Sequence, residues 1–254
     1  MQSTLKQKIA DGACVLGTML SELSTPNIAR IMHACGFEFL IIDCEHGYFD
    51  LPQVAAITAV CAGIGLPAVI RIPAVSRELI TKYLDMGAAG LLLPMTSTPE
   101  QARELVRYAK YPPLGQRGLS IQRAHTNYNP PPLHQYLDEA NRHTVLFAQI
   151  ESREGIKNIR DILAIDGIDG ALVGPNDLAS DYGTPGELET PEMEEGISCV
   201  LSAAAELGKP CGFISSKIPL LEKWRSRGMT ILSCNSEVGM IIEAGRQIVK
   251  KINS

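Results

Sequence analysis

The feature that most constrains this sequence is a regular alternation of short apolar runs with segments of helical periodicity, which continues along the whole chain. A run that is apolar at successive positions is buried on both faces when it forms a strand, as in a parallel sheet covered by helices. The segments between the runs carry apolar residues at spacings of three and four, which is typical of amphipathic helices. Eight runs are predicted to be strands: Val15–Met19, Phe39–Ile42, Ala68–Arg71, Leu91–Pro94, Val145–Ile150, Ala171–Val173, Cys211–Phe213 and Thr230–Ser233.

Eight such units in 254 residues favour a closed (β/α)8 barrel, a TIM barrel of the α/β class, over an open sheet. We expect one domain over residues 1–254. Helix boundaries support this assignment, because Thr98-Pro99-Glu100 and Thr190-Pro191-Glu192 each read as an N-cap followed by a proline in the first turn. Glycines are placed as helix C-caps before several strands, namely Gly36, Gly65, Gly87, Gly167 and Gly228.

Two segments depart from this rhythm. Tyr111 to Pro132 is rich in proline and glycine and is predicted to be a long loop that shapes a site or an interface. The last helix, roughly Val238 to Ile252, carries an apolar stripe. This helix is expected either to close the barrel or to pack at a subunit interface.

Charge and composition argue against several classes of partner. The net charge is −5 and charges of both signs are spread along the chain, so neither nucleic acid nor an anionic membrane surface is an expected partner. The apolar runs are too short to span a bilayer. Residues Met1 to Ala10 do not resemble a signal peptide, and the seven cysteines include no CxxC pair. These features lead us to expect a cytoplasmic enzyme.

Candidate site residues follow the strands, because barrel enzymes carry their reactive groups at the carboxyl ends of strands. His46 comes soon after the second strand, beside Asp43 and Glu45, and a histidine there can act as a base near neutral pH. A solvated turn is the alternative for this segment. Arg71 ends the third strand, where a guanidinium can bind the carboxylate of a ligand or form a buried ion pair with Asp43 or Glu45.

Two carboxylates are expected at adjacent strand ends. Gln149 and Glu151 share one face at the end of the fifth strand, and Asp177 follows the sixth. Neighbouring carboxylates repel one another unless they share a proton or a cation, and an oxygen-only pair suits Mg²⁺ or Mn²⁺. The alternative for Asp177 is a capping role in a short helix that begins near Pro175.

Asp85 ends the helical segment before the fourth strand. An acid at a helix C-terminus interacts unfavourably with the helix dipole, so a partner elsewhere is expected, with His46 as the candidate.

Taken in order, these motifs resemble the HpcH/HpaI aldolase family, the class II pyruvate-dependent aldolases. The resemblance covers almost the whole chain. It is carried by Gly17-Thr18-Met19, Asp43-Cys44-Glu45-His46-Gly47, Arg71-Ile72-Pro73, Gly87-Ala88-Ala89-Gly90, Tyr111-Pro112-Pro113, Gly115-Gln116-Arg117-Gly118, Gln149-Ile150-Glu151 and Gly174-Pro175-Asn176-Asp177-Leu178.

The resemblance implies a role for each candidate residue. Glu151 and Asp177 would ligate a divalent metal ion, namely Mg²⁺, Mn²⁺ or Co²⁺. Arg71 would hold the pyruvate carboxylate, and Gln149 would contact the oxo acid. His46 would transfer a proton, with Asp85 as its partner. Gly174 and Pro175 would line the substrate site, and the family implies homo-oligomers, commonly hexamers.

One departure from the family pattern lies at the end of the eighth strand. The family often has a Gly-Ser-Asp-like turn at this point, whereas this chain reads Ser233-Cys234-Asn235-Ser236. This change leaves the expected metal ligands in place, but it bears on the aldehyde partner.

The implied reaction is reversible cleavage of a 4-hydroxy-2-oxo acid to pyruvate and an aldehyde through a metal-stabilised enolate. A Schiff-base aldolase would instead need a lysine on a strand, and the eight predicted strands contain none. Two further alternatives are an acyl-CoA lyase of the citrate-lyase β type and a barrel that serves as a non-catalytic subunit. The expected small molecules are a 2-oxo acid and an aldehyde whose identity stays open.

Overall fold

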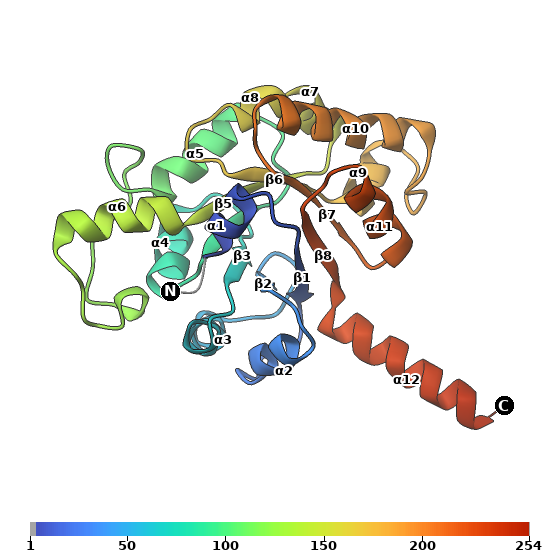
Figure 1. Cartoon of the computed structure of the whole chain (residues 1–254), viewed down its shortest axis with the longest axis horizontal. Coiled ribbons are helices and arrows are strands. Elements are labelled where there is room, and N and C mark those ends of the chain that lie inside the picture. The colour runs from blue at the N-terminus through green and yellow to red at the C-terminus, as the bar shows by residue number, and fades with distance from the viewer. Residues whose placement is uncertain (1–3, 254) are drawn as a thin grey trace.

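The computed structural model describes residues 4–253, so the outermost residues of the expected 1–254 domain lie outside the described part. Eight parallel strands close into a barrel in which each strand pairs with the next along the chain and β8 pairs with β1 (Figure 1). The predicted (β/α)8 barrel is therefore confirmed. The strands are β1 (Val15–Leu20), β2 (Phe39–Asp43), β3 (Ala68–Arg71), β4 (Gly90–Leu93), β5 (Val145–Ile150), β6 (Gly170–Val173), β7 (Cys211–Ser215) and β8 (Ile231–Ser236).

All eight strands form where the apolar runs predict them, and only their ends differ. The largest differences are at β7 and β8, which continue to Ser215 and Ser236 beyond the predicted ends. Polar side chains at the carboxyl end of the barrel interrupt the apolar run while the backbone pairing goes on. An apolar pattern therefore underestimates strands that reach a polar site.

Helices follow the strands around the outside of the barrel (Figure 1). The predicted caps are confirmed, because Thr98 accepts a hydrogen bond from the Gln101 N–H and Thr190 accepts one from the Met193 N–H. The described helices are α1 (Leu5–Ala10), α2 (Ile28–Ala34), α3 (Leu51–Ile64), α4 (Arg77–Asp85), α5 (Pro99–Ala109), α6 (Leu133–His143), α7 (Arg153–Lys157), α8 (Ile159–Leu163), α9 (Pro175–Asp181), α10 (Pro191–Glu206), α11 (Ile218–Ser226) and α12 (Glu237–Asn253), with a 3-10 turn at Ala124–Thr126.

The five predicted C-cap glycines all have positive φ angles. Gly65, for example, ends α3 with φ of 71°, a backbone conformation that a residue with a Cβ rarely adopts.

Most strand residues are buried, on both faces of the sheet, which divides the core into two layers. The outer layer lies between the barrel and its helices. The inner layer fills the barrel. Its Phe39 ring packs against Gly17, where a Cβ would lie 2.6 Å from the ring. Leu5 and Ile9 of α1 join this inner layer at the amino ends of the strands. The barrel interior is therefore packed solid below the carboxyl end.

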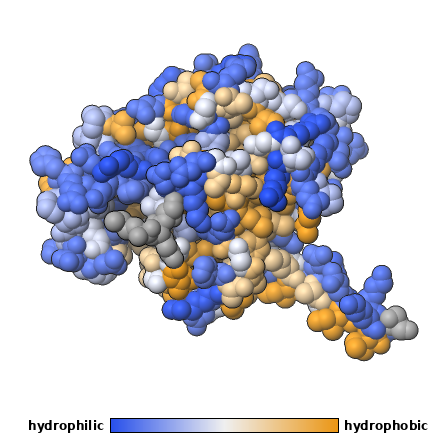
Figure 2. All heavy atoms as spheres, viewed as in Figure 1, coloured by the Kyte–Doolittle hydropathy of each residue, from blue (hydrophilic) through white to orange (hydrophobic). Residues whose placement is uncertain are grey.

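The last helix, α12, extends away from the barrel (Figure 1). Its apolar stripe is exposed and shows as hydrophobic side chains along the projecting helix in Figure 2. Of the two roles expected for this helix, closing the barrel is wrong, since its only buried residue is Glu237 at its start. The exposed residues of the stripe are Ile241, Ile242, Ile248, Val249 and Ile252.

No helix within residues 4–253 combines the length and apolar character that crossing a membrane requires. The segment Tyr111 to Pro132 is, as predicted, a long connection, and Ala124–Thr126 is its one short turn of helix.

Candidate active site

An ion pair between β2 and β3 lies at the centre of the candidate site. Asp43 and Arg71 are direct neighbours in the strand register. Arg71 donates from Nε to Asp43 Oδ1 at 2.9 Å and from Nη2 to Asp43 Oδ2 at 2.7 Å. Both side chains are more than nine-tenths buried, so the pair is a two-point, charge-assisted interaction shielded from water. One of the two alternatives for Arg71, the buried ion pair, is therefore confirmed.

The segment that follows Asp43 is organised by the same carboxylate. Asp43 Oδ1 accepts hydrogen bonds from the backbone N–H groups of Glu45 and His46, at 3.0 and 3.3 Å. Glu45 Oε2 lies 3.2 Å from Arg71 Nη1 and 3.9 Å from His46 Nε2. The His46 side chain is 70% exposed at this rim. His46 is thus an accessible imidazole beside a carboxylate, on a turn whose backbone N–H groups are bound by Asp43.

Glu151 is, with Asp43, one of two almost fully buried carboxylates of the group. It directly follows β5, accepts a hydrogen bond from the Met95 N–H at 2.8 Å through Oε2, and accepts one from Gln149 Nε2 at 2.6 Å through Oε1. Burial raises the pKa of Glu151 to about 7, and the negative charges of Asp177 and Glu45 act in the same direction. A carboxylate held in this way is poorly compensated by the protein alone.

The neighbouring β6 end provides a glycine that packs against Glu151 and a second carboxylate. A Cβ at Gly174 would lie 2.1 Å from Glu151 Oε1 and 2.8 Å from Gln149 Nε2, so only glycine fits there. Pro175 is the first residue of α9 and is buried. Asp177 lies in the first turn of α9, but Gly174 is the N-cap and no side chain caps this helix. The capping alternative for Asp177 is therefore wrong.

These residues fit a divalent cation that shares its coordination sphere with water and substrate. No cluster of three or more His, Cys, Asp and Glu side chains in the described part of the chain is arranged to hold a metal ion. Two carboxylates are nevertheless enough for Mg²⁺, which usually keeps several waters and takes other ligands from its substrate. The Gln149 Oε1 atom is buried without a hydrogen-bond partner, so an acceptor remains for a ligand at this end of the barrel.

Asp85 does not lie beside His46 in this chain. It ends α4 near the amino end of β4, at the end of the barrel opposite to Glu151. Its carboxylate receives a 2.7 Å hydrogen bond from Arg117 Nη2, and His125 Nδ1 lies 3.1 Å from its carbonyl oxygen. The unfavourable position at a helix end is thus compensated by Arg117 in the long loop, and the proposed contact with His46 is absent within the chain.

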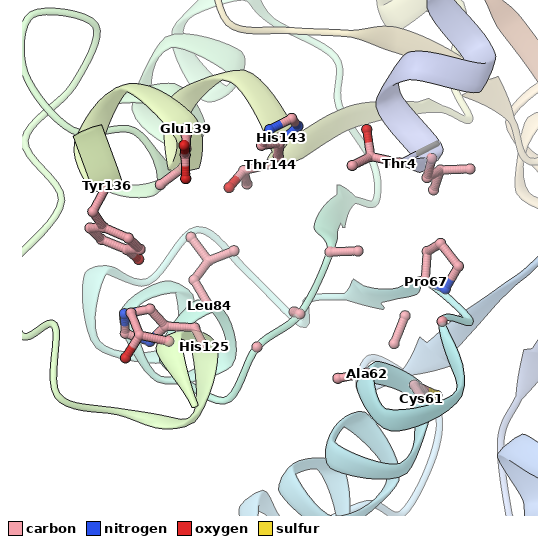
Figure 3. A pocket seen from close by; sticks show the side chains of 18 of the residues that line it. Thr4, Cys61, Ala62, Pro67, Leu84, His125, Tyr136, Glu139, His143 and Thr144 are labelled. Carbon is pink, nitrogen blue, oxygen red and sulfur yellow. The ribbon is translucent and has the colours of Figure 1, made fainter. Parts of the chain in front are cut away.

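A cavity of about 510 Å³ lies at that amino end, next to Asp85 (Figure 3). His125, Tyr136 and Leu84 line one side of it, and Cys61, Ala62 and Pro67 line another. Arg117 and His125 come from the long loop, which was expected to shape a site or an interface. The loop therefore contributes to this cavity rather than to the site around Glu151.

Sequence reasoning missed two groups that support the site. Met95 donates its backbone N–H to Glu151 with φ of 48°, and no sequence signal marks a non-glycine residue in that conformation. Glu237 is completely buried and binds the turn after β1. A signal existed for Glu237, because an acid in the first turn of a helix directly after the last strand lies at the same end of the barrel.

Comparison with known proteins agrees with the geometry. A profile of the family described as HpcH/HpaI aldolase/citrate lyase matches residues 18–244. A hydroxypyruvate/pyruvate aldolase of Roseovarius nubinhibens is 33% identical over 98% of this chain and 96% of its own length. A 5-keto-4-deoxy-D-glucarate aldolase of Citrobacter koseri is 30% identical over 90% of this chain and 88% of its own length.

The structural comparison gives the same answer. The crystal structure of an HpcH/HpaI aldolase from Desulfitobacterium hafniense superimposes with a TM-score of 0.95 and 33% identity, covering 99% of this chain and 97% of that one. Sequence and fold agree over nearly the whole chain, including the segments that carry Asp43, Arg71, Glu151 and Asp177. The chain therefore belongs to the HpcH/HpaI aldolase/citrate lyase family.

Proposed function

We propose that this protein is a class II aldolase, dependent on a divalent metal ion, that reversibly cleaves a 4-hydroxy-2-oxo acid to pyruvate and an aldehyde. The observation that carries the proposal is the buried Glu151 carboxylate, whose pKa is raised to about 7 while Asp177 and Glu45 add negative charge around it. This excess of negative charge, around a Glu151 carboxylate that packs directly against Gly174, favours a cation together with a chelating ligand.

Glu151 and Asp177 would hold the cation, for which Mg²⁺, Mn²⁺ or Co²⁺ suits an oxygen-rich site. When bound, the cation supplies an electrophile for the 2-oxo oxygen, on which negative charge develops as the carbon–carbon bond breaks. Met95 keeps Glu151 in position through its backbone N–H.

Arg71 would bind the carboxylate of the oxo acid. Its Nε and Nη2 atoms are engaged by Asp43, which fixes the plane of the guanidinium. Nη1 faces Glu45 and still has a proton for a substrate oxygen. The NH₂ group of Gln149 donates to Glu151, so Gln149 would accept a hydrogen bond from a hydroxyl group of the oxo acid with its unpartnered side-chain oxygen.

His46 would take the proton from the 4-hydroxyl group as the bond between C3 and C4 breaks. The bond electrons pass to C3 and the 2-oxo oxygen, the aldehyde leaves, and protonation of C3 then gives pyruvate. Glu45, with Oε2 at 3.9 Å from His46 Nε2, is the carboxylate that this chain places beside the imidazole.

The test is pyruvate release from a panel of 4-hydroxy-2-oxo acids, with and without EDTA. We expect release that EDTA abolishes and added Mg²⁺ or Mn²⁺ restores. Trapping of a covalent pyruvate adduct by borohydride would overturn the proposal. Cleavage of acyl-CoA esters alone would favour the citrate-lyase β alternative, and no turnover of any compound would favour a non-catalytic subunit.

The exposed stripe of α12 supports a further part of the proposal. A contiguous apolar face on a projecting helix is unusual for a monomer and is typical of an interface. We therefore propose that α12 packs against a second copy of the chain in a homo-oligomer, a hexamer by family resemblance, in the cytoplasm.

A further inference from the structure

Glu237, the first residue of α12, binds the turn that follows β1. Its Oε1 atom accepts hydrogen bonds from the backbone N–H groups of Ser21, Glu22 and Leu23, at 2.8, 2.7 and 3.0 Å. The side chain is completely buried. Three successive N–H groups that converge on one point form an anion-binding nest, and here the anion is supplied by another part of the same chain.

The path from β8 to α12 holds Glu237 in place. Asn235 adopts φ of 58°, its Oδ1 accepts the Ser236 N–H at 2.8 Å, and its carbonyl faces Thr18 Oγ1 at 3.3 Å. A Cβ at Gly239 would lie 1.9 Å from Asn235 Oδ1, so the first turn of α12 packs directly on this residue. The end of β8, Ser233-Cys234-Asn235-Ser236, thus places the Glu237 carboxylate at the turn after β1.

The turn after β1, Ser21–Leu23, packs on the segment that carries His46. A Cβ at Gly47 would lie 2.2 Å from the Asp43 carbonyl oxygen and 2.9 Å from the Ser21 carbonyl oxygen. Ser21 therefore abuts the Asp43–Gly47 segment without a gap. A shift of the turn by a fraction of an ångström would displace this segment.

We propose that Glu237 is a positioning residue of the active site, which fixes the turn Ser21–Leu23 and, through it, the Asp43–Gly47 segment that presents His46. The hydrogen bonds of the Glu237 carboxylate go to Ser21, Glu22 and Leu23 and not to the expected metal ligands. Its effect on catalysis rests on the proposed aldolase function, whereas its effect on the geometry of the segment does not.

The first experiment compares Glu237→Ala and Glu237→Gln with the matched control Glu243→Gln, which changes an exposed carboxylate on the same helix. Hydrogen-bond partners that orient metal ligands typically affect activity by about 10- to 100-fold, and we expect a residue that positions His46 to act in the same range. We expect Glu237→Ala to lower kcat in this range with little change in KM, because Arg71, which would bind the oxo acid, lies on β3 and not in the displaced segment. We expect a smaller loss in Glu237→Gln, which keeps an acceptor oxygen, and none in the control.

Added formate separates positioning from general stability. In Glu237→Ala, the empty nest of three N–H groups can bind a small anion, so we expect formate to restore part of kcat in this variant and to leave the wild type unchanged. An unchanged kcat in Glu237→Ala, or a loss of kcat that formate does not reverse while the variant stays folded, would count against the proposal.

Hydrogen exchange tests the geometry without any substrate. In Glu237→Ala we expect faster amide exchange in peptides covering residues 21–23 and 44–48, and unchanged exchange in β5. Glu237→Gln provides the same measurement if the alanine variant fails to fold. Faster exchange confined to α12 or to 21–23 would overturn the proposed link to His46. If the wild type has no aldolase activity, the proposed function fails, while this exchange pattern still decides the role of Glu237.

Discussion

Gly174 and Glu151 are in contact at a point where the barrel has no room for a side chain, since a Cβ on Gly174 would lie only 2.1 Å from Glu151 Oε1. The two residues come from the ends of the adjacent strands β6 and β5. Glu151 is held by its hydrogen bonds from Met95 and Gln149, and Gly174 is held by the bond from its N–H to the Ile150 carbonyl oxygen. The contact therefore fixes where the carboxylate points.

Gly174→Ala should weaken binding of Mn²⁺ by roughly 10- to 100-fold, because the added methyl group forces Glu151 out of position. Titration calorimetry of the purified variant measures this directly. Gly63→Ala is the matched control, since a Cβ at Gly63 meets no atom within 4 Å and should leave binding unchanged. Equal affinities in the Gly174→Ala variant and the wild type would contradict this account of the site.

His46→Ala should lower kcat by about 10²- to 10⁴-fold, the usual contribution of a positioned acid or base, and should leave Mn²⁺ affinity intact. The imidazole is exposed at the rim and is not expected to bind the cation. His33→Ala, which changes an exposed histidine of α2, serves as the control. Wild-type turnover by His46→Ala would exclude the proton-transfer role.

Asp43→Ala should destabilise the protein by about 3–5 kcal/mol, because it leaves the buried Arg71 charge without its two-point partner. Urea unfolding followed by circular dichroism gives this free energy. The exposed ion pair between Glu78 and Lys82 offers a comparison, and Glu78→Ala should leave stability nearly unchanged. A loss in Asp43→Ala no larger than in that surface variant would show that the pair is not shielded from water.

Lys110 should make stability depend on pH. Burial lowers its pKa from 10.5 to about 7, although its Nζ donates to the carbonyl oxygens of Asn141 and Thr144. Between about pH 7 and 10.5 the unfolded chain binds more protons than the folded one at this residue. The contribution of Lys110 to the free energy of unfolding therefore rises with pH across this window, by at most about 1.4 kcal/mol per pH unit.

Urea unfolding of the wild type and Lys110→Met at several values between pH 7 and pH 9.5 tests this dependence. The difference between the two proteins should shift in favour of the wild type as the pH rises. Lys157→Met, which changes an exposed lysine of α7, should run parallel to the wild type. If the free energy of unfolding of Lys110→Met also runs parallel to that of the wild type, the buried amine of Lys110 keeps its proton throughout this pH range.

Replacing Ile241 and Ile248 together by glutamate should reduce the oligomeric state, because charges on an apolar interface are costly to bury. Analytical ultracentrifugation measures the change. Gln247→Glu adds a charge on the same helix outside the apolar stripe and should leave the assembly intact. If the double variant has the wild-type mass, the stripe does not form the interface.

The strands and the main site residues could be predicted because both follow from local pattern. Strands buried on both faces appear as continuous apolar runs, and a polar residue at the end of such a run must lie at the rim of the barrel. Arg71 and Glu151 were found in this way. The roles of these residues in catalysis and metal binding stay predictions.

The partner of Asp85 could not be predicted from the sequence. An unfavourable charge at a helix end signals that a partner exists, but not which one. The partner is Arg117, from a loop whose path depends on packing that no periodicity reveals. Met95 was missed for a similar reason, since its backbone conformation is imposed by its surroundings rather than by its side chain.

The attachment of α12 through Glu237 has a practical consequence for handling the protein. A tag or fusion partner joined behind α12 can pull on the buried Glu237 carboxylate, which lies at the end of the barrel that carries the candidate site. A tag joined ahead of α1 lies at the opposite end of the barrel, where Leu5 and Ile9 pack into the inner core. Purification handles therefore belong on the amino-terminal side when kinetics are to be measured.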